Sequence, residues 1–87
     1  MTEIRRVLHS ETGIKASIYC EADISAKAIC AVYDVCGQML SVDIKPLVAG
    51  TENTVAFSVK LTGAKTVKVF VVGQDVVPYC TYKELEL

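Results

Sequence analysis

Strict alternation of apolar and polar residues is the feature that most constrains the fold of this chain. Every second residue from 55 to 61 is Val, Phe, Val or Leu, and the same period runs through 14–21 and 40–45. Successive side chains of a strand point to opposite sides of a sheet, so this period predicts strands that bury one face. Val, Ile and Thr, which suit a pleated surface, supply 13, 6 and 7 of the 87 residues. The chain is therefore predicted to be all-β.

Turn signals divide the chain into about seven strands, predicted at 4–10, 14–21, 27–34, 40–45, 54–61, 67–72 and 79–85. The third and sixth, 27–34 and 67–72, are apolar on both sides, as expected of strands paired in the middle of one sheet. An immunoglobulin-like β-sandwich of antiparallel strands places them there. A small β-barrel has a similar number of strands and is the alternative. With 87 residues, the chain is expected to be a single domain, 1–87.

The predicted core follows from the same alternation, since each of its members continues the apolar side of a strand. It comprises Ile14, Ile18, Val32, Leu40, Val42, Val55, Phe57, Val59, Leu61, Val67 and Val69.

Composition excludes several classes of function. Apolar residues make up 52% of the chain, but no run approaches the roughly 20 that a transmembrane helix needs, so no membrane insertion is expected. A net charge of -1, spread along the chain, offers no electrostatic footprint for nucleic acid. The first ten residues hold no apolar run that could serve as the core of a signal peptide. We expect the domain to be excised from a longer protein.

Two short motifs resemble those of a known module. Ala31-Val32-Tyr33-Asp34 is followed by Gly37 and an apolar strand, and the stretch 67–71 (VKVFV) is followed at a distance by Pro78. From about residue 13 to residue 78 the chain resembles a small immunoglobulin/fibronectin type III-like β-sandwich accessory module of clostridial and related Gram-positive surface and secreted proteins. Val72 stands where those modules usually carry an aromatic residue. The resemblance implies an extracellular or cell-surface accessory domain without catalysis of its own.

The cysteines and the single histidine show no catalytic or metal-binding pattern. His9 lies in the least regular strand, and Cys20, Cys30, Cys36 and Cys80 include no C-x-x-C pair of the kind found in common zinc sites. We therefore expect no enzyme activity, no metal and no cofactor. The polar pairs 52–53 and 74–75 are expected to be turn residues, since a calcium site needs more oxygen ligands.

The disulfide state stays open at this point. A bridge between Cys30 and Cys36 is disfavoured, because Cys30 lies about 13 Å along the strand from the turn that holds Cys36. One bridge among Cys20, Cys30 and Cys80 is the alternative to an interpretation that we favour. In that interpretation Cys20 and Cys30 are small buried hydrophobes, and Cys36 is an exposed thiol.

Tyr33 and Phe70 are the candidate ligand or partner residues. Both lie on central strands, and their alternation places them on the second side of one sheet. That side must be covered, and we expect a loop, a neighbouring domain, another protein or a second copy of the chain to cover it. The predicted function is a non-catalytic structural or protein-interaction module. The alternative is a carbohydrate-binding module attached to a polysaccharide-acting enzyme, with Tyr33 and Phe70 as a stacking platform. The oligomeric state stays undetermined.

Overall fold

A computed structural model describes residues 1–11, 13–22, 24–73 and 77–87. Within these residues strands are the only regular secondary structure, joined by turns and loops. No helix that could cross a membrane occurs among them. The seven strands of the described residues are β1 (Glu3–Ser10), β2 (Gly13–Cys20), β3 (Lys27–Tyr33), β4 (Met39–Pro46), β5 (Thr51–Phe57), β6 (Thr66–Val72) and β7 (Lys83–Glu86).

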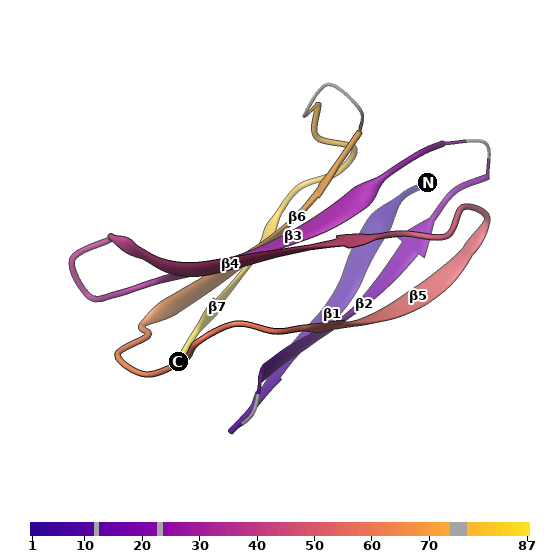
Figure 1. The fold of residues 1–87 in the computed structure, drawn as a ribbon. Coiled ribbons are helices and arrows are strands. Elements are labelled where there is room, and N and C mark those ends of the chain that lie inside the picture. Colours follow the sequence, from indigo (N-terminus) through magenta and orange to yellow (C-terminus); the bar gives the residue numbers. More distant parts are fainter. Residues whose placement is uncertain (12, 23, 74–76) are drawn as a thin grey trace.

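The strands form two antiparallel sheets that pack face to face (Figure 1). Sheet A has the order β1-β2-β5, and sheet B has the order β4-β3-β6-β7. β3 and β6 pair at the centre of sheet B, as the two-sided apolar segments predicted. The sheets remain separate layers and do not close into a barrel among the described residues. The prediction of an immunoglobulin-like sandwich is confirmed, and the barrel alternative is wrong.

The core lies between the inner sides of the two sheets. Inward residues of β2 and β5 in sheet A meet inward residues of β3 and β6 in sheet B. The buried cluster comprises Ile4, Ile14, Ala16, Ile18, Cys20, Ala26, Ala28, Cys30, Val32, Val55, Phe57, Val67, Val69 and Val71. Val59 and Leu61 pack against it partly buried, because β5 ends at Phe57 and the chain leaves the sheet there.

Two residues that were predicted to lie in the core lie on the surface instead. Leu40 is 40% exposed and Val42 is 49% exposed, because β4 turns its apolar side away from the other sheet. The alternation in β4 was correct, but the side assigned to the core was not. The apolar residues of this strand therefore belong to the surface of the molecule.

Two strands begin several residues away from their predicted starts. The last strand begins at Lys83 and not at residue 79. β5 begins at Thr51, so Glu52 and Asn53 are strand residues and not turn residues. The Asn53 side chain nevertheless holds the preceding turn, since its Oδ1 accepts from the Val48 N–H at 2.8 Å and its Nδ2 donates to the Val48 carbonyl at 3.0 Å. The predicted turn at 74–75 lies outside the described residues.

Candidate functional site

The outer side of sheet B is an apolar surface. The registers of β3 with β4 and β6 place Ile44, Ile29 and Phe70 in one row across the sheet, and Val42, Ala31 and Lys68 in the next row. We call this surface the apolar face. It comprises Ile29, Ala31, Tyr33, Leu40, Val42, Ile44, Phe70, Val72 and Tyr82.

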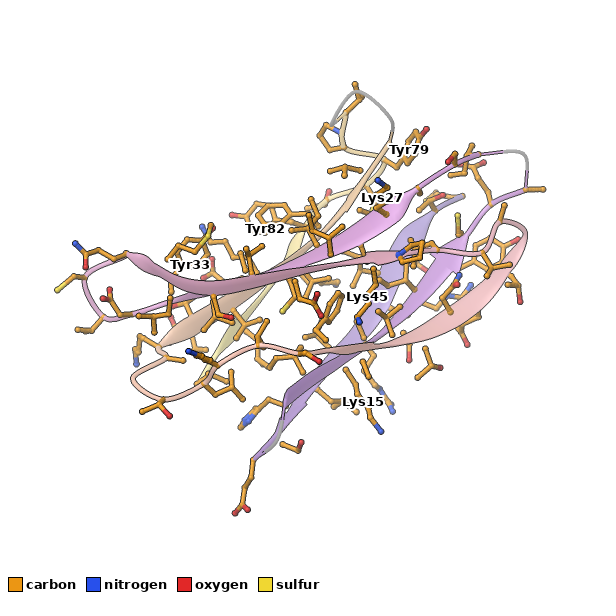
Figure 2. All side chains as sticks on the ribbon, in the orientation of Figure 1. Lys15, Lys27, Tyr33, Lys45, Tyr79 and Tyr82 are labelled. Carbon is orange, nitrogen blue, oxygen red and sulfur yellow. The ribbon has the colours of Figure 1, made fainter. Side chains whose placement is uncertain are left out.

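The inner side of β4 explains why its apolar residues point outward. Asp43 Oδ2 accepts a hydrogen bond from the Ser58 N–H at 2.8 Å, and Ser41 Oγ accepts one from the Lys60 N–H at 3.2 Å. These polar side chains hold the segment that follows β5 against the edge of sheet B. Lys45 lies on the same side of β4, and its Nζ is 3.7 Å from Asp43 Oδ2 (Figure 2). The inner side of this edge strand is therefore a polar seam.

Tyr33 and Phe70, the two predicted site residues, lie on the same face but are not cross-strand neighbours. Tyr33 pairs with Thr66, and Phe70 pairs with Ile29, so one cross-strand pair of residues separates them. That pair is Ala31 with Lys68. The expectation that both residues share one side of adjacent central strands is confirmed. The structure does not bring their rings together as one flat platform.

Two residues outside the predicted pair, Lys68 and Tyr82, link these rings. The Lys68 Nζ lies 5.3 Å from the centroid of the Tyr33 ring and 5.5 Å from that of Tyr82, within the range of cation–π attraction. The Tyr82 ring lies 5.3 Å from the Phe70 ring at a tilt of 34°. Lys68 also reaches Glu84 Oε1 at 3.9 Å. The rings are thus engaged with one another and with a cation.

Figure 2 shows Lys27, Tyr33 and Tyr82 on the side of sheet B that faces away from sheet A. Lys27 pairs with Val72, so it stands at the end of the apolar face that is far from Tyr33. Lys27 and Lys68 balance Glu84 and Glu86 on this side of the sheet. The apolar face therefore carries charges of both signs around an apolar middle.

The outer side of sheet A has the opposite character. Arg5 lies at a β-bulge and reaches Glu3 at 3.2 Å and Glu52 at 3.4 Å, with its guanidinium 5.3 Å from the Tyr19 ring centroid. Lys15 projects from the same side (Figure 2). A charged and hydrogen-bonding surface of this kind is well solvated. The two outer surfaces of one small domain thus differ sharply in chemistry.

The four cysteines are free. Cys20 and Cys30 are buried and Cys36 is exposed, as the favoured interpretation predicted, while Cys80 is half-buried. Burial, reinforced by the nearby Asp43 carboxylate, raises the pKa of the Cys30 thiol to about 12. Burial also raises the pKa values of the Cys20 and Cys80 thiols. These three groups stay protonated at neutral pH, which makes them poor nucleophiles.

His9 and the acidic residues do not form a metal site in the described part of the chain. His9 pairs with Ile14 along β1 and is exposed. No group of three or more His, Cys, Asp or Glu residues that could hold a metal ion occurs among residues 1–11, 13–22, 24–73 and 77–87.

Comparison of this chain with protein-family models, with curated proteins and with solved structures finds no match.

Proposed function

We propose that this chain is a non-catalytic structural or protein-interaction module that docks through its apolar face. The contrast between the two outer surfaces carries this proposal. Large apolar side chains cluster on sheet B, whereas the equivalent side of sheet A carries charged pairs. Contiguous exposed apolar patches with a polar rim mark interaction sites on proteins.

Several features of the apolar face suit a protein partner. The face includes three aliphatic side chains without hydrogen-bonding groups, Ile29, Val42 and Ile44. Another apolar surface would remove them from water, which is favourable, whereas a polar ligand would find no hydrogen-bond partner on them. Tyr33 and Tyr82 are among the residue types that are enriched where proteins meet. In agreement with the resemblance noted from the sequence, the module is proposed to belong to a bacterial surface or secreted protein and to lie outside the cell or on its surface.

One observation favours carbohydrate binding as the second candidate. A hollow of about 270 Å³ beside the β3–β4 hairpin is lined by Tyr33, Asp34, Lys65, Lys68 and Glu84, among other residues. Sugar rings stack on aromatic rings, and their hydroxyl groups bond to such charged side chains. However, Lys68 already lies near the Tyr33 ring and Phe70 near the Tyr82 ring. Each of these rings thus already has a cation or another ring beside it.

Titration against a panel of cell-wall and plant polysaccharides, followed by calorimetry or affinity electrophoresis, separates the two functions. The proposed function predicts no saturable binding. The test variants are Tyr33→Ala and Phe70→Ala, and Tyr19→Ala on the outer side of sheet A is the matched control. Saturable binding that is lost in both test variants, kept in the control, and accompanied by an unchanged circular dichroism spectrum would assign the face to carbohydrate.

A further inference from the structure

We propose that the partner of the apolar face is a second copy of this chain, packed face to face across a two-fold axis. This inference rests on the proposed function and names the occupant of that surface. The axis runs across the strands of sheet B, between the row of Ile29 and the row of Ala31. Sheet B of one copy then lies on sheet B of the other, with the strands running in opposite directions.

The β4 edge of sheet B is guarded, which favours packing by the face over strand pairing at this edge. Asp43 Oδ1 accepts the Ile44 N–H at 2.9 Å, so this N–H is not available to a neighbouring strand. The segment after β5 is bonded to Asp43 and Ser41 and lies along the same edge. β4 ends in Pro46, which has no N–H to donate. Inward-pointing charge, a covering segment and proline are the devices that protect edge strands from pairing.

The part of the face on β3 and β4 is apolar, and the proposed axis brings it against the same part of the partner. A two-fold axis across the strands places each strand over its own copy and exchanges the two central rows. Ile44 then lies over the partner's Val42, and Ile29 lies over the partner's Ala31. Ala31 is already covered by its larger neighbours, so the partner's Ile29 side chain rests on the apolar side chains around it. Apolar residues thus meet apolar residues along β3 and β4.

The rings and charged residues of the face also meet favourable partners in the second copy. The same axis places Phe70 over the partner's Lys68 and Lys27 over the partner's Tyr33. Both are contacts between a ring and a cation, which gain strength when water is excluded. The charges on the face are balanced, and the net charge of the chain is only -1, so two copies repel each other little.

A two-fold axis parallel to the strands fits less well. It would place β4 over the partner's β7, so that Val42 would press on the partner's Glu84. A carboxylate covered by an apolar side chain loses water without gaining a new partner, which is costly. The polarity of the face therefore selects the axis that crosses the strands.

The size of the face suits a reversible dimer. The four strands of the face, β4, β3, β6 and β7, have 8, 7, 7 and 4 residues. With strands about 4.8 Å apart and a rise of about 3.3 Å per residue, the face has a flat area of roughly 410 Å². Two copies thus cover roughly 800 Å² before the relief of the side chains is counted, an area that belongs to weak, transient interfaces. We expect a dissociation constant on the order of 10 to 100 μM, typical of a small interface.

Sedimentation velocity over a range from about 5 μM to about 1 mM tests the association, because this range spans the expected dissociation constant. Ile44→Lys is the test variant, and Leu8→Lys on the outer side of sheet A is its matched control. Both side chains are 54% exposed, both lie on edge strands, and both substitutions add the same charge. We expect Ile44→Lys to raise the dissociation constant at least about tenfold, since it places a lysine against the partner's Val42, and Leu8→Lys to change it less than about twofold.

A spin-label distance tests the direction of the axis. Cys36 is exposed at the tip of the β3–β4 hairpin, which protrudes at one end of the molecule (Figure 1). Cys20 and Cys30 are buried, and Cys80→Ser removes the remaining accessible thiol. The proposed axis puts the two hairpin tips at opposite ends, about 35 Å apart, whereas an axis parallel to the strands brings them within about 20 Å.

Each outcome has a distinct meaning. A dimer that Ile44→Lys weakens and Leu8→Lys does not, with a label distance near 35 Å, supports the inference. A monomer at every concentration, equal effects of the two variants, or a short label distance would overturn it. None of these results concerns polysaccharides. Failure of the second-copy inference therefore stays separate from failure of the proposed function, which saturable sugar binding would reveal.

Discussion

Asp43 joins the two sheets, and its removal is the sharpest test of the polar seam. This side chain is 22% exposed, and its Oδ2 accepts the Ser58 N–H from the segment that follows β5. Its Oδ1 accepts the Ile44 N–H on its own strand. If this seam holds the inner side of β4 in place, Asp43→Ala must lower the free energy of unfolding although no apolar contact is lost.

The magnitude follows from the individual contacts. A hydrogen bond to a charged group contributes about 1.5 to 3 kcal/mol, and the bond to the exposed Ser58 belongs at the low end because water can replace it. The bond to Ile44 lies at the edge of the sheet and adds about 0.5 kcal/mol or less. The ion pair with Lys45, at 3.7 Å on a half-exposed site, adds a similarly small amount. The sum is about 2 kcal/mol, or a fall in melting temperature of roughly 8 to 16 °C for a domain of this size.

Urea unfolding and calorimetry measure this loss, with three variants for comparison. Asp43→Asn keeps one acceptor oxygen and is expected to recover about half of the loss. Ser41→Ala removes a longer bond between neutral groups and is expected to cost about 0.5 to 1 kcal/mol. Lys45→Ala is expected to cost less than about 0.5 kcal/mol. An Asp43→Ala loss below about 0.5 kcal/mol, or one smaller than that of Ser41→Ala, would refute the reasoning.

Two further predictions concern the core. Phe57→Ala removes the largest aromatic side chain of the buried cluster and is expected to cost about 3 to 5 kcal/mol in urea unfolding, so an unchanged midpoint would contradict the core assignment. Stability is also expected to fall above pH 9: the Cys30 thiol keeps its proton up to a pKa of about 12 when folded but loses it near its ordinary value of 9.0 when unfolded. Its contribution is therefore complete below pH 9 and lost between pH 9 and 12, with a slope of up to about 1.4 kcal/mol per pH unit. Unfolding measured against pH should show a smaller slope in Cys30→Ala, and an equal slope would exclude this thiol as the source.

The sequence predicted the number and pairing of the strands because their period is a local property. The apolar segments 27–34 and 67–72 had no polar side, which identified β3 and β6 as the centre of one sheet. The side of β4 that faces the core is not local, since Leu40 and Val42 alternate equally well in either orientation. The answer depends on Asp43 and Ser41, whose partners come from the chain after β5.

The candidate surface was predicted in part for the same reason. Tyr33 and Phe70 lie on strands whose pairing the pattern indicated, so their common side could be inferred. Tyr82 precedes a short strand, and its contact with Phe70 follows from how the chain enters β7. Lys68 was the single charged residue on the mostly apolar second side of segment 67–72. Only the register of β3 with β6 shows that its amino group lies beside the Tyr33 ring.

The shortness of β7 has a consequence for aggregation. β6 has the sequence TVKVFVV, an apolar and β-branched segment with one charge, which is the composition that readily forms cross-β assemblies. On one side it pairs with β3, and on the other side with the four residues of β7 and, through Val72, with Pro78. β7 therefore places three charged residues, Lys83, Glu84 and Glu86, beside this segment, and charges at such positions oppose aggregation. Cleavage of the chain before Lys83 would therefore leave the stretch of β6 that pairs with β7 open to pairing with another chain.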